Sequence, residues 1–201
     1  MNAIERAKNI ITSPNKEWDV IAHEQPNTGQ IITNYVLLLA GAAAVAAFIG
    51  YSFIGFGYGL FHYASISWGI YYALKVLVAA IAGVFINALI IDALAPSFGS
   101  EKNMGRSMQL VAYSNTPFWV ASLLAIYPPL AIIGLLGGLY GLYLLYTGMP
   151  KLKKTPADKH AGYFVVSIVT MIVVYIIISI IMSTIVLAGM GLSYGYGRFR
   201  F

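Results

Sequence analysis

The most constraining feature of this chain is a long uncharged segment with two adjacent prolines near its middle. No Asp, Glu, Lys or Arg occurs between Ser107 and Pro150, and Pro128 and Pro129 divide the stretch into two halves. A helix needs ~20 apolar residues to cross a bilayer core of ~30 Å, and each half supplies about that number. The segment therefore predicts a transmembrane helical hairpin formed by Ser107–Tyr127 and Pro128–Thr147.

The composition places the rest of the chain in the membrane as well. Hydrophobic residues make up 59% and charged residues 9% of the 201 positions, against roughly 25% charge in a soluble domain. We therefore predict an all-α integral membrane bundle of five transmembrane helices. The three further spans are expected at about Ile31–Phe53, Trp68–Ala93 and Tyr163–Leu187, with a glycine-rich, aromatic break after the first.

The first 30 residues form the one sizeable polar segment. Ile4, Ala7, Ile10 and Ile11 recur at helical spacing, which favours an amphipathic helix lying on the membrane surface. Ser13 and Pro14 are typical of the start of a second short helix, in which Trp18 is expected to anchor at the headgroup level. A loosely ordered tail is the alternative, because isolated helices of this length are marginal in water.

The distribution of Lys and Arg predicts the orientation. Most of these residues lie in 1–30 and in the loops near 96–106 and 151–160, while Arg198 and Arg200 lie at the other side. The positive-inside rule makes the first side cytoplasmic. We expect a cytoplasmic segment 1–30, a membrane domain 31–188 and an external tail 189–201, in a prokaryotic cytoplasmic (inner) membrane.

A layer of polar residues is predicted ~9 Å below the cytoplasmic surface, from the depths of Asn87 and Tyr113 at 1.5 Å per residue. Pro117 cannot donate to the Tyr113 carbonyl, so the third helix should kink and leave that carbonyl needing a partner. The layer is either a pocket open to the cytoplasm or structural hydrogen bonding between helices. Its members are Asn87, Tyr113, Ser114, Asn115, Pro117, Tyr140 and Tyr143.

Three other sets of residues are candidates for contacts. Asp92 is expected to form an ion pair with the nearby loop, with Arg106 as a partner, or to serve as a cation site. Overlapping GxxxG spacings predict close helix packing; they comprise Gly134, Gly137, Gly138 and Gly141. The second charged loop is a candidate for anionic-lipid contact through Lys151, Lys153, Lys154 and Lys159.

Several segments resemble the Yip-type domain, a membrane family named for proteins that interact with Ypt/Rab GTPases. They are Leu94–Gly99 (LAPSFG), Ala112–Pro117 (AYSNTP), Gly138–Gly148 (GLYGLYLLYTG) and Ser13–Trp18 (SPNKEW), the last of which is similar to the prokaryotic branch. The resemblance covers nearly the whole chain and implies a five-helix membrane protein with a cytoplasmic N-terminus. The eukaryotic role in vesicle traffic is not implied here, because the chain lacks the long polar N-terminal region of many such relatives.

The sequence offers little support for an enzyme. Cysteine is absent and the three histidines are scattered without metal-ligand spacing, so neither a metal nor a cofactor is expected. The basic residues form no single face that would bind nucleic acid. We expect a non-enzymatic, membrane-organising or partner-binding component whose partners are the lipid bilayer and a membrane protein or a second copy. The alternative is a small-solute or ion transporter that uses the polar layer.

Overall fold

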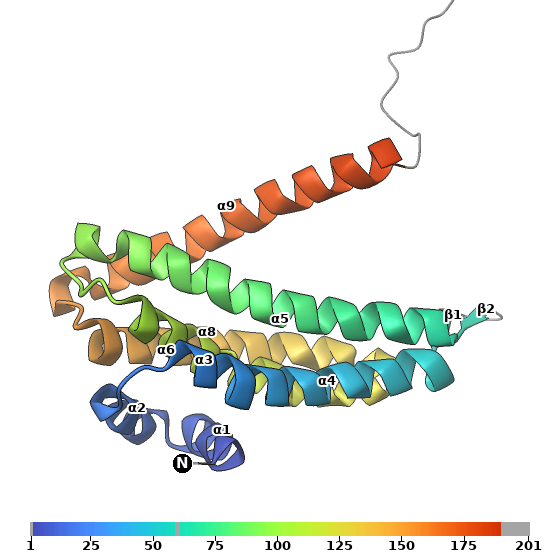
Figure 1. Ribbon diagram of the computed structural model, residues 1–201, viewed down its shortest axis with the longest axis horizontal. Coiled ribbons are helices and arrows are strands. Elements are labelled where there is room, and N and C mark those ends of the chain that lie inside the picture. The colour runs from blue at the N-terminus through green and yellow to red at the C-terminus, as the bar shows by residue number, and fades with distance from the viewer. Residues whose placement is uncertain (1, 59–60, 190–201) are drawn as a thin grey trace, which may run out of the picture.

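The structure is a computed structural model that describes residues 2–58 and 61–189. Apart from one short hairpin, the described elements are helices (Figure 1). Four helices are long and apolar enough to cross a membrane, namely Thr28–Ile54, Ile66–Phe98, Pro128–Lys153 and Ala157–Ile181. The predicted third span is missing from this set, and the predicted tail lies outside the described residues after position 189.

The N-terminal segment folds into two short helices, α1 (Ala3–Thr12) and α2 (Pro14–His23). The Asn2 side chain caps α1 by accepting a hydrogen bond from the Ile4 N–H at 3.2 Å, and Pro14 occupies the first turn of α2, where its fixed φ suits a helix. The predicted headgroup anchor is wrong, because Trp18 is fully buried. Its ring lies against α8, within 2.7 Å of where a Cβ at Gly148 would stand.

The first span is one continuous helix with two wider turns. It comprises α3 (Thr28–Ile31), the π turn η1 (Ile32–Val36), α4 (Leu37–Ile49) and the π turn η2 (Gly50–Ile54). Gly55 then takes a φ of 72°, which a residue without a Cβ adopts at no steric cost. Strands β1 (Phe56–Tyr58) and β2 (Phe61–Tyr63) follow as an antiparallel pair, so the predicted break falls where the glycines are.

The second span begins with a side-chain cap. Ser65 Oγ accepts a hydrogen bond from the Trp68 N–H at 3.2 Å, which satisfies one of the free N–H groups at the start of α5 (Ile66–Leu94). The helix continues into the 3₁₀ turn η3 (Ala95–Phe98), and Gly99 ends it in the left-handed conformation. This returns the chain to the end of the bundle where α1 and α2 lie.

The predicted third span is broken into α6 (Met104–Ser114), α7 (Thr116–Ser122) and the 3₁₀ turn η4 (Leu123–Ile126). The interruption at Asn115 follows from Pro117, whose ring nitrogen carries no hydrogen. The segment nevertheless runs between the two ends of the bundle. Arg106 donates to the Ile21 carbonyl of α2 at 2.9 Å, whereas a Cβ on Gly50, near the far end of the first span, would lie 2.9 Å from the Ile126 carbonyl oxygen.

The chain then turns at the two prolines and crosses back. The 3₁₀ turn η5 (Pro128–Ile132) leads into α8 (Ile133–Lys153), and α9 (Ala157–Gly189) follows after a short connection. Figure 1 shows that α9 starts beside α5 and leans away from the other helices along its length.

Glycines bring α8 close to the broken segment. A Cβ on Gly137 would overlap the Pro117 carbonyl and stand 2.8 Å from its carbon, and a Cβ on Gly141 would stand 2.6 Å from the Ser114 oxygen. Gly138 has more space, with the nearest atom at 3.8 Å. One of the two GxxxG pairs, Gly137 and Gly141, therefore lies against the helix break.

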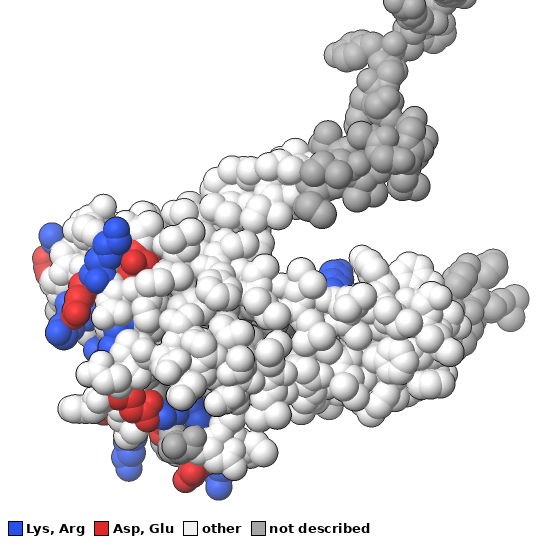
Figure 2. All heavy atoms as spheres, viewed as in Figure 1, with Lys and Arg blue, Asp and Glu red and all other residues white. Residues whose placement is uncertain are grey.

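Charged side chains gather at one end of the molecule in the view of Figure 2. This charged end is formed by α1, α2 and the connections 95–103 and 154–156, and the opposite end, with the β1–β2 hairpin, is called the distal end. Lys75 is the only Lys or Arg between Ile66 and Ala95. The asymmetry agrees with the separation of charge expected for a chain that spans a membrane.

Candidate functional site

A buried ion pair lies at the charged end between α5 and α8. Lys153 Nζ, on a side chain that is 0% exposed, lies 2.9 Å from Asp92 Oδ1. It also donates to Ser107 Oγ at 2.8 Å and to the Asn103 carbonyl at 3.2 Å. Asp92 Oδ1 in turn accepts from the Asn103 N–H at 2.7 Å. These bonds join the last turns of α5 and α8 to the start of α6, and Lys153 stands where the helix dipole favours a cation.

The predicted ion pair between Asp92 and Arg106 is wrong, because Asp92 pairs with Lys153 and the Arg106 side chain turns toward α2. Its two terminal nitrogens donate to the carbonyls of Ile21 and Ala22, each at 2.9 Å. These carbonyls belong to the last turn of α2, where carbonyls have no partner in a following helical turn; the Ile21 carbonyl also accepts from the Glu24 N–H at 3.1 Å. Arg106 therefore caps α2, a contact invisible until α2 is placed beside α6.

The four lysines expected to contact anionic lipid have different surroundings. Lys153 is buried and cannot reach a headgroup, which corrects that expectation for this residue. Lys151 Nζ pairs with Asp19 at 2.6 Å and donates to the Asn15 carbonyl at 2.7 Å. Lys154 Nζ lies 2.8 Å from Glu101 on the surface, and its hydrogen bond lowers the pKa of the Glu101 carboxyl. Lys151 and Lys154 thus already have acidic partners, and lipid contact by Lys159 stays a prediction.

A second buried cation holds α1 in place. Arg6 is 5% exposed; its guanidinium donates to Glu17 at 2.7 Å and also to Glu24. It lies over the Tyr113 ring, 5.3 Å from the centroid. Two carboxylates and an aromatic face offset the loss of hydration that burial imposes on a cation. Arg6 was absent from the predicted site, because its charge looked like the solvent-facing side of a surface helix.

The Tyr113 carbonyl, which Pro117 leaves without a backbone donor, has a partner just across the break. Thr116 Oγ1 donates to the Tyr113 oxygen at 2.7 Å. Tyr35 Oη lies 2.6 Å from the same Thr116 oxygen, and since the threonine proton is already used, the tyrosine is the donor. The resulting chain of hydrogen bonds links the first span to the broken segment at the break.

The predicted polar layer separates into two groups. Tyr113 packs edge-on against Tyr35 with the ring centroids 4.8 Å apart, and a crevice of about 340 Å³ beside it is lined by polar groups of α1, α6 and the first span. Asn115 instead lies with Asn87 on a different cavity. Successive helix residues differ by roughly 100°, so positions 113 and 115 face nearly opposite ways. The proposed meeting of Asn87 and Tyr113 is therefore wrong.

The remaining members of the layer lie on α6 and α8. Tyr140 Oη donates to the Ile11 carbonyl at 2.7 Å, which fixes the end of α1 to α8. Tyr143 stacks on Tyr140 at 5.6 Å and is 46% exposed. Ser114 is buried, and its carbonyl faces Gly141. Most of the predicted residues thus hold helices together around the break.

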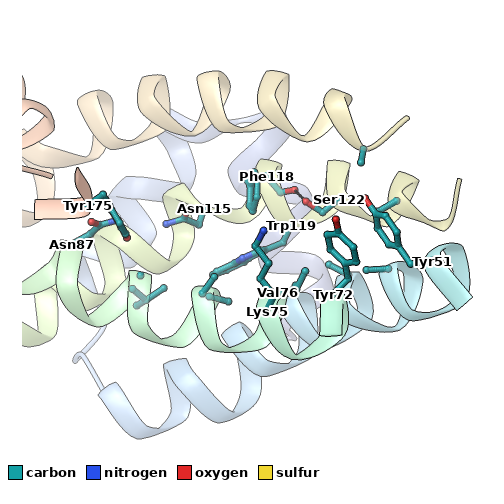
Figure 3. A pocket seen from close by; sticks show the side chains of 18 residues that line it. Tyr51, Tyr72, Lys75, Val76, Asn87, Asn115, Phe118, Trp119, Ser122 and Tyr175 are labelled. Atoms are coloured by element: carbon teal, nitrogen blue, oxygen red, sulfur yellow. Dashed lines mark hydrogen bonds between the residues drawn. The ribbon is translucent and has the colours of Figure 1, made fainter. Parts of the chain in front are cut away.

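Asn87 and Asn115 line the inner end of a cavity of about 470 Å³ between α4, α5 and α7. Figure 3 shows the cavity running from these residues past Lys75 to Tyr51 and Tyr72 at the distal end. Its walls are mostly apolar and are formed by alanine, valine and aromatic side chains. Such a lining suits an apolar occupant better than a hydrated solute.

The fold and these contacts define a class, the multi-pass helical membrane proteins with a structured N-terminal hairpin. A family profile for the Yip1 domain matches residues 8–195. The chain belongs to the Yip1 domain family. It is 31% identical over 146 residues to the inner membrane protein YohC of Escherichia coli K12, a match that covers 70% of this chain and 75% of the relative. The same values hold for YohC of Escherichia coli O6:H1. No solved structure gives a significant match.

Proposed function

We propose that this protein is a non-enzymatic component of the prokaryotic inner membrane that organises the membrane or binds a partner protein at its charged end. The observation that carries the proposal is the fixed docking of α1 and α2. Arg6 ties α1 to Glu17 of α2, Lys151 ties α2 to α8, and Arg106 caps α2 from α6. A rigid polar face favours partner binding, because no free energy is lost in ordering a flexible tail.

The proposed arrangement has five crossings with the charged end in the cytoplasm. Its support is that α6, α7 and η4 together run between the same two ends as the four continuous spans, although a proline divides them. The positive-inside rule then assigns the face that carries α1 and α2 to the cytoplasm. The relatives named as inner membrane proteins favour the same compartment.

A transporter for small hydrated solutes is the less favoured function. Its polar layer would need to face one pathway, yet Tyr113 and Tyr140 contact α1 and the first span, while Asn87 and Asn115 lie at the end of a mainly apolar cavity. The polar side chains therefore supply no continuous hydrated route along the described helices.

Site-specific photocrosslinking in cells tests the partner-binding face. A crosslinking residue at Lys16, which is exposed on α2, is expected to capture one discrete protein, or a second copy of the chain. The same residue at Val45, which is 59% exposed on α4, is the control and should capture lipid. Arg6→Gln should weaken the Lys16 adduct because it releases α1 from α2.

Two results would argue against the proposal. Adducts from Lys16 that match those from Val45 would show that the charged end has no preferred protein neighbour. A solute flux in reconstituted vesicles that Asn87→Leu abolishes without loss of thermal stability would favour the transporter.

A further inference from the structure

The cavity beside Lys75 has a feature that packing between helices does not explain. Among the described residues that line it there is one cation, Lys75, and no Asp or Glu. The ammonium lies over an aromatic ring, with Lys75 Nζ 5.6 Å from the centroid of Tyr72. A cation at an apolar surface is costly unless an anion or water reaches it. The site therefore has room for a negative group that the described lining residues do not supply.

The position of Lys75 along α5 places it at a membrane interface. Asp92 and Lys153 mark the charged end, and Lys75 lies 17 residues before Asp92 by subtraction of their numbers, which is ~26 Å along a helix. The hydrocarbon core is ~30 Å thick, so the backbone at Lys75 stands just inside the opposite boundary, and its long side chain can extend toward the lipid phosphates.

Aromatic residues at the same level support this placement. Tyr51 and Tyr72 stack with their centroids 3.7 Å apart, and Trp68 packs edge-on against Tyr71 at 5.8 Å. Trp68 and Tyr71 are exposed on the outside of the bundle. Trp and Tyr concentrate where lipid headgroups meet the hydrocarbon, so the mouth of the cavity lies in the headgroup region of the distal leaflet.

From its mouth the cavity extends inward along α5 over an apolar wall. Val76, Ala80 and Val84 follow Lys75 on the lining face, and Asn87 closes the inner end. The distance from position 75 to position 87 is ~18 Å on a helix, slightly more than half of a ~30 Å core. The volume of about 470 Å³ falls within the ~300–1,000 Å³ typical of ligand sites.

The cavity is also reachable from the bilayer. Lys75 and Ala79 are exposed in the described structure, and α9 leans away from α5 on this side (Figures 1 and 2). A molecule in the distal leaflet therefore reaches the cavity by lateral movement without crossing the bundle.

We propose that this cavity binds an anionic phospholipid of the distal leaflet, with the phosphate on Lys75 and one acyl chain along the α5 wall toward Asn87. The cation supplies the charge complement, the aromatic residues position the headgroup, and the small side chains of α4 and α5 leave the space for the chain. The inference does not depend on the proposed function, because it concerns the other end of the molecule.

The test uses the full chain in vesicles of phosphatidylcholine and phosphatidylglycerol, where the phosphatidylglycerol carries a photoreactive group on one acyl chain. After irradiation, mass spectrometry should place adducts on residues 76–87 of α5. Lys75→Gln should reduce them about fivefold, the scale of one cation near an anionic surface, and Lys75→Arg should keep them. Unlabelled phosphatidylglycerol should compete, whereas unlabelled phosphatidylcholine should compete less.

A matched pair of variants separates the cavity from the general lipid surface. Ala79 lines the cavity, so Ala79→Phe should block the chain and remove the adducts. Val78, its neighbour, is 64% exposed and outside the lining, so Val78→Phe should leave them unchanged. Thermal unfolding confirms that each variant folds, and the competition on the wild type does not rely on any variant.

Three outcomes would overturn the inference. Adducts spread evenly over the lipid-facing surface and indifferent to Lys75→Gln would mean that no site exists. Equal competition by the two lipids would remove the charge recognition. A disulfide-linked dimer of an Ala79→Cys variant, in a chain with no cysteine of its own, would show that a second copy fills the space.

Discussion

Single side chains decide how the charged end is assembled. Asp92, Lys153 and Ser107 come from three helices, yet their polar atoms lie within 3.2 Å of one another. Removing one partner of such a pair leaves the other charge buried without compensation, and this costs more than the intact pair contributes. The neighbouring pair of Lys154 with Glu101 has the same chemistry in a solvated position, so it provides a comparison.

Lys153→Met should lower the stability of the detergent-solubilised protein by about 3 kcal/mol, the low end for a broken buried pair. The low end applies because Asp92 keeps its hydrogen bond from the Asn103 N–H. Lys154→Met should cause no measurable change. Thermal unfolding followed by tryptophan fluorescence measures both. Addition of Asp92→Asn to Lys153→Met should recover most of the loss, and a double variant as unstable as the single would contradict the assignment.

The threonine at the break is the second residue whose role can be measured. Thr116→Val keeps the shape but removes the donor to the Tyr113 carbonyl and the acceptor for Tyr35. Unpaired buried polar groups cost about 1–3 kcal/mol, so we expect a loss of stability in that range. Thr147→Val is the control, because Thr147 bonds back to carbonyls in the unbroken helix α8. Equal losses of stability in the two variants would mean that the hydrogen bonds of Thr116 contribute no more than those of a threonine in an unbroken helix.

At this scale the sequence predicted residue types better than partners. Pro117 correctly pointed to a free carbonyl at Tyr113, because that consequence depends on local backbone chemistry alone. The choice of Lys153 over Arg106 for Asp92 depended on the rotation of α8 and the docking of α2. Neither the rotation of α8 nor the docking of α2 can be read from residue spacing, and so the sequence assigned the wrong partner to Asp92.

Among the elements, α8 and the broken segment determine each other. Gly137 and Gly141 allow α8 to approach the backbone at Ser114 and Pro117, where a continuous helix would present side chains instead. The break and the glycines thus form one contact, in which small residues permit close packing as in other membrane helices.

Two adjacent glycines test this contact. Gly137→Ala places a methyl group against the Pro117 carbonyl and 3.0 Å from the Ala121 Cβ, so we expect a loss of about 1–3 kcal/mol from overpacking. Gly138→Ala meets its nearest atom at 3.8 Å, and the better helix propensity of alanine should leave stability equal or up to ~1 kcal/mol higher. Thermal unfolding in one detergent compares them. A reversed order would show that α8 is rotated from the position described.

Element positions were largely predictable and element continuity was not. Length, charge gaps and the glycines between Gly50 and Gly59 located the first span, the second span and the break between them. The π turns of the first span and the 3₁₀ turns flanking Pro128 leave no trace in hydropathy. Pro117 predicted a kink. Whether a proline bends a helix or divides it depends on the neighbours of the freed carbonyl, here Thr116, which donates to it, and Tyr35, which bonds to the Thr116 hydroxyl.

For the whole molecule, the central issue is whether the divided segment counts as a crossing. If only the four continuous spans crossed the membrane, α8 would have to begin at the charged end, where the second span finishes. The contact of Gly50 with Ala125 and Ile126 instead places the start of the proline turn beside the distal part of the first span. The division also costs little in lipid, because Thr116 donates to the freed Tyr113 carbonyl, which the bilayer cannot satisfy.

Cysteine accessibility tests this topology with single substitutions in a chain that has no cysteine of its own. Lys102, Pro129 and Asp158 are exposed and lie respectively before the divided segment, after it and after α8. A membrane-impermeant maleimide applied to intact cells should label Pro129→Cys, and Ser67→Cys near the start of α5, while Lys102→Cys and Asp158→Cys should react only after the membrane is opened. Labelling of Pro129→Cys together with Lys102→Cys from one side would mean that the segment enters the membrane and returns. The chain would then have four crossings, and α9 would end on the same side as α1.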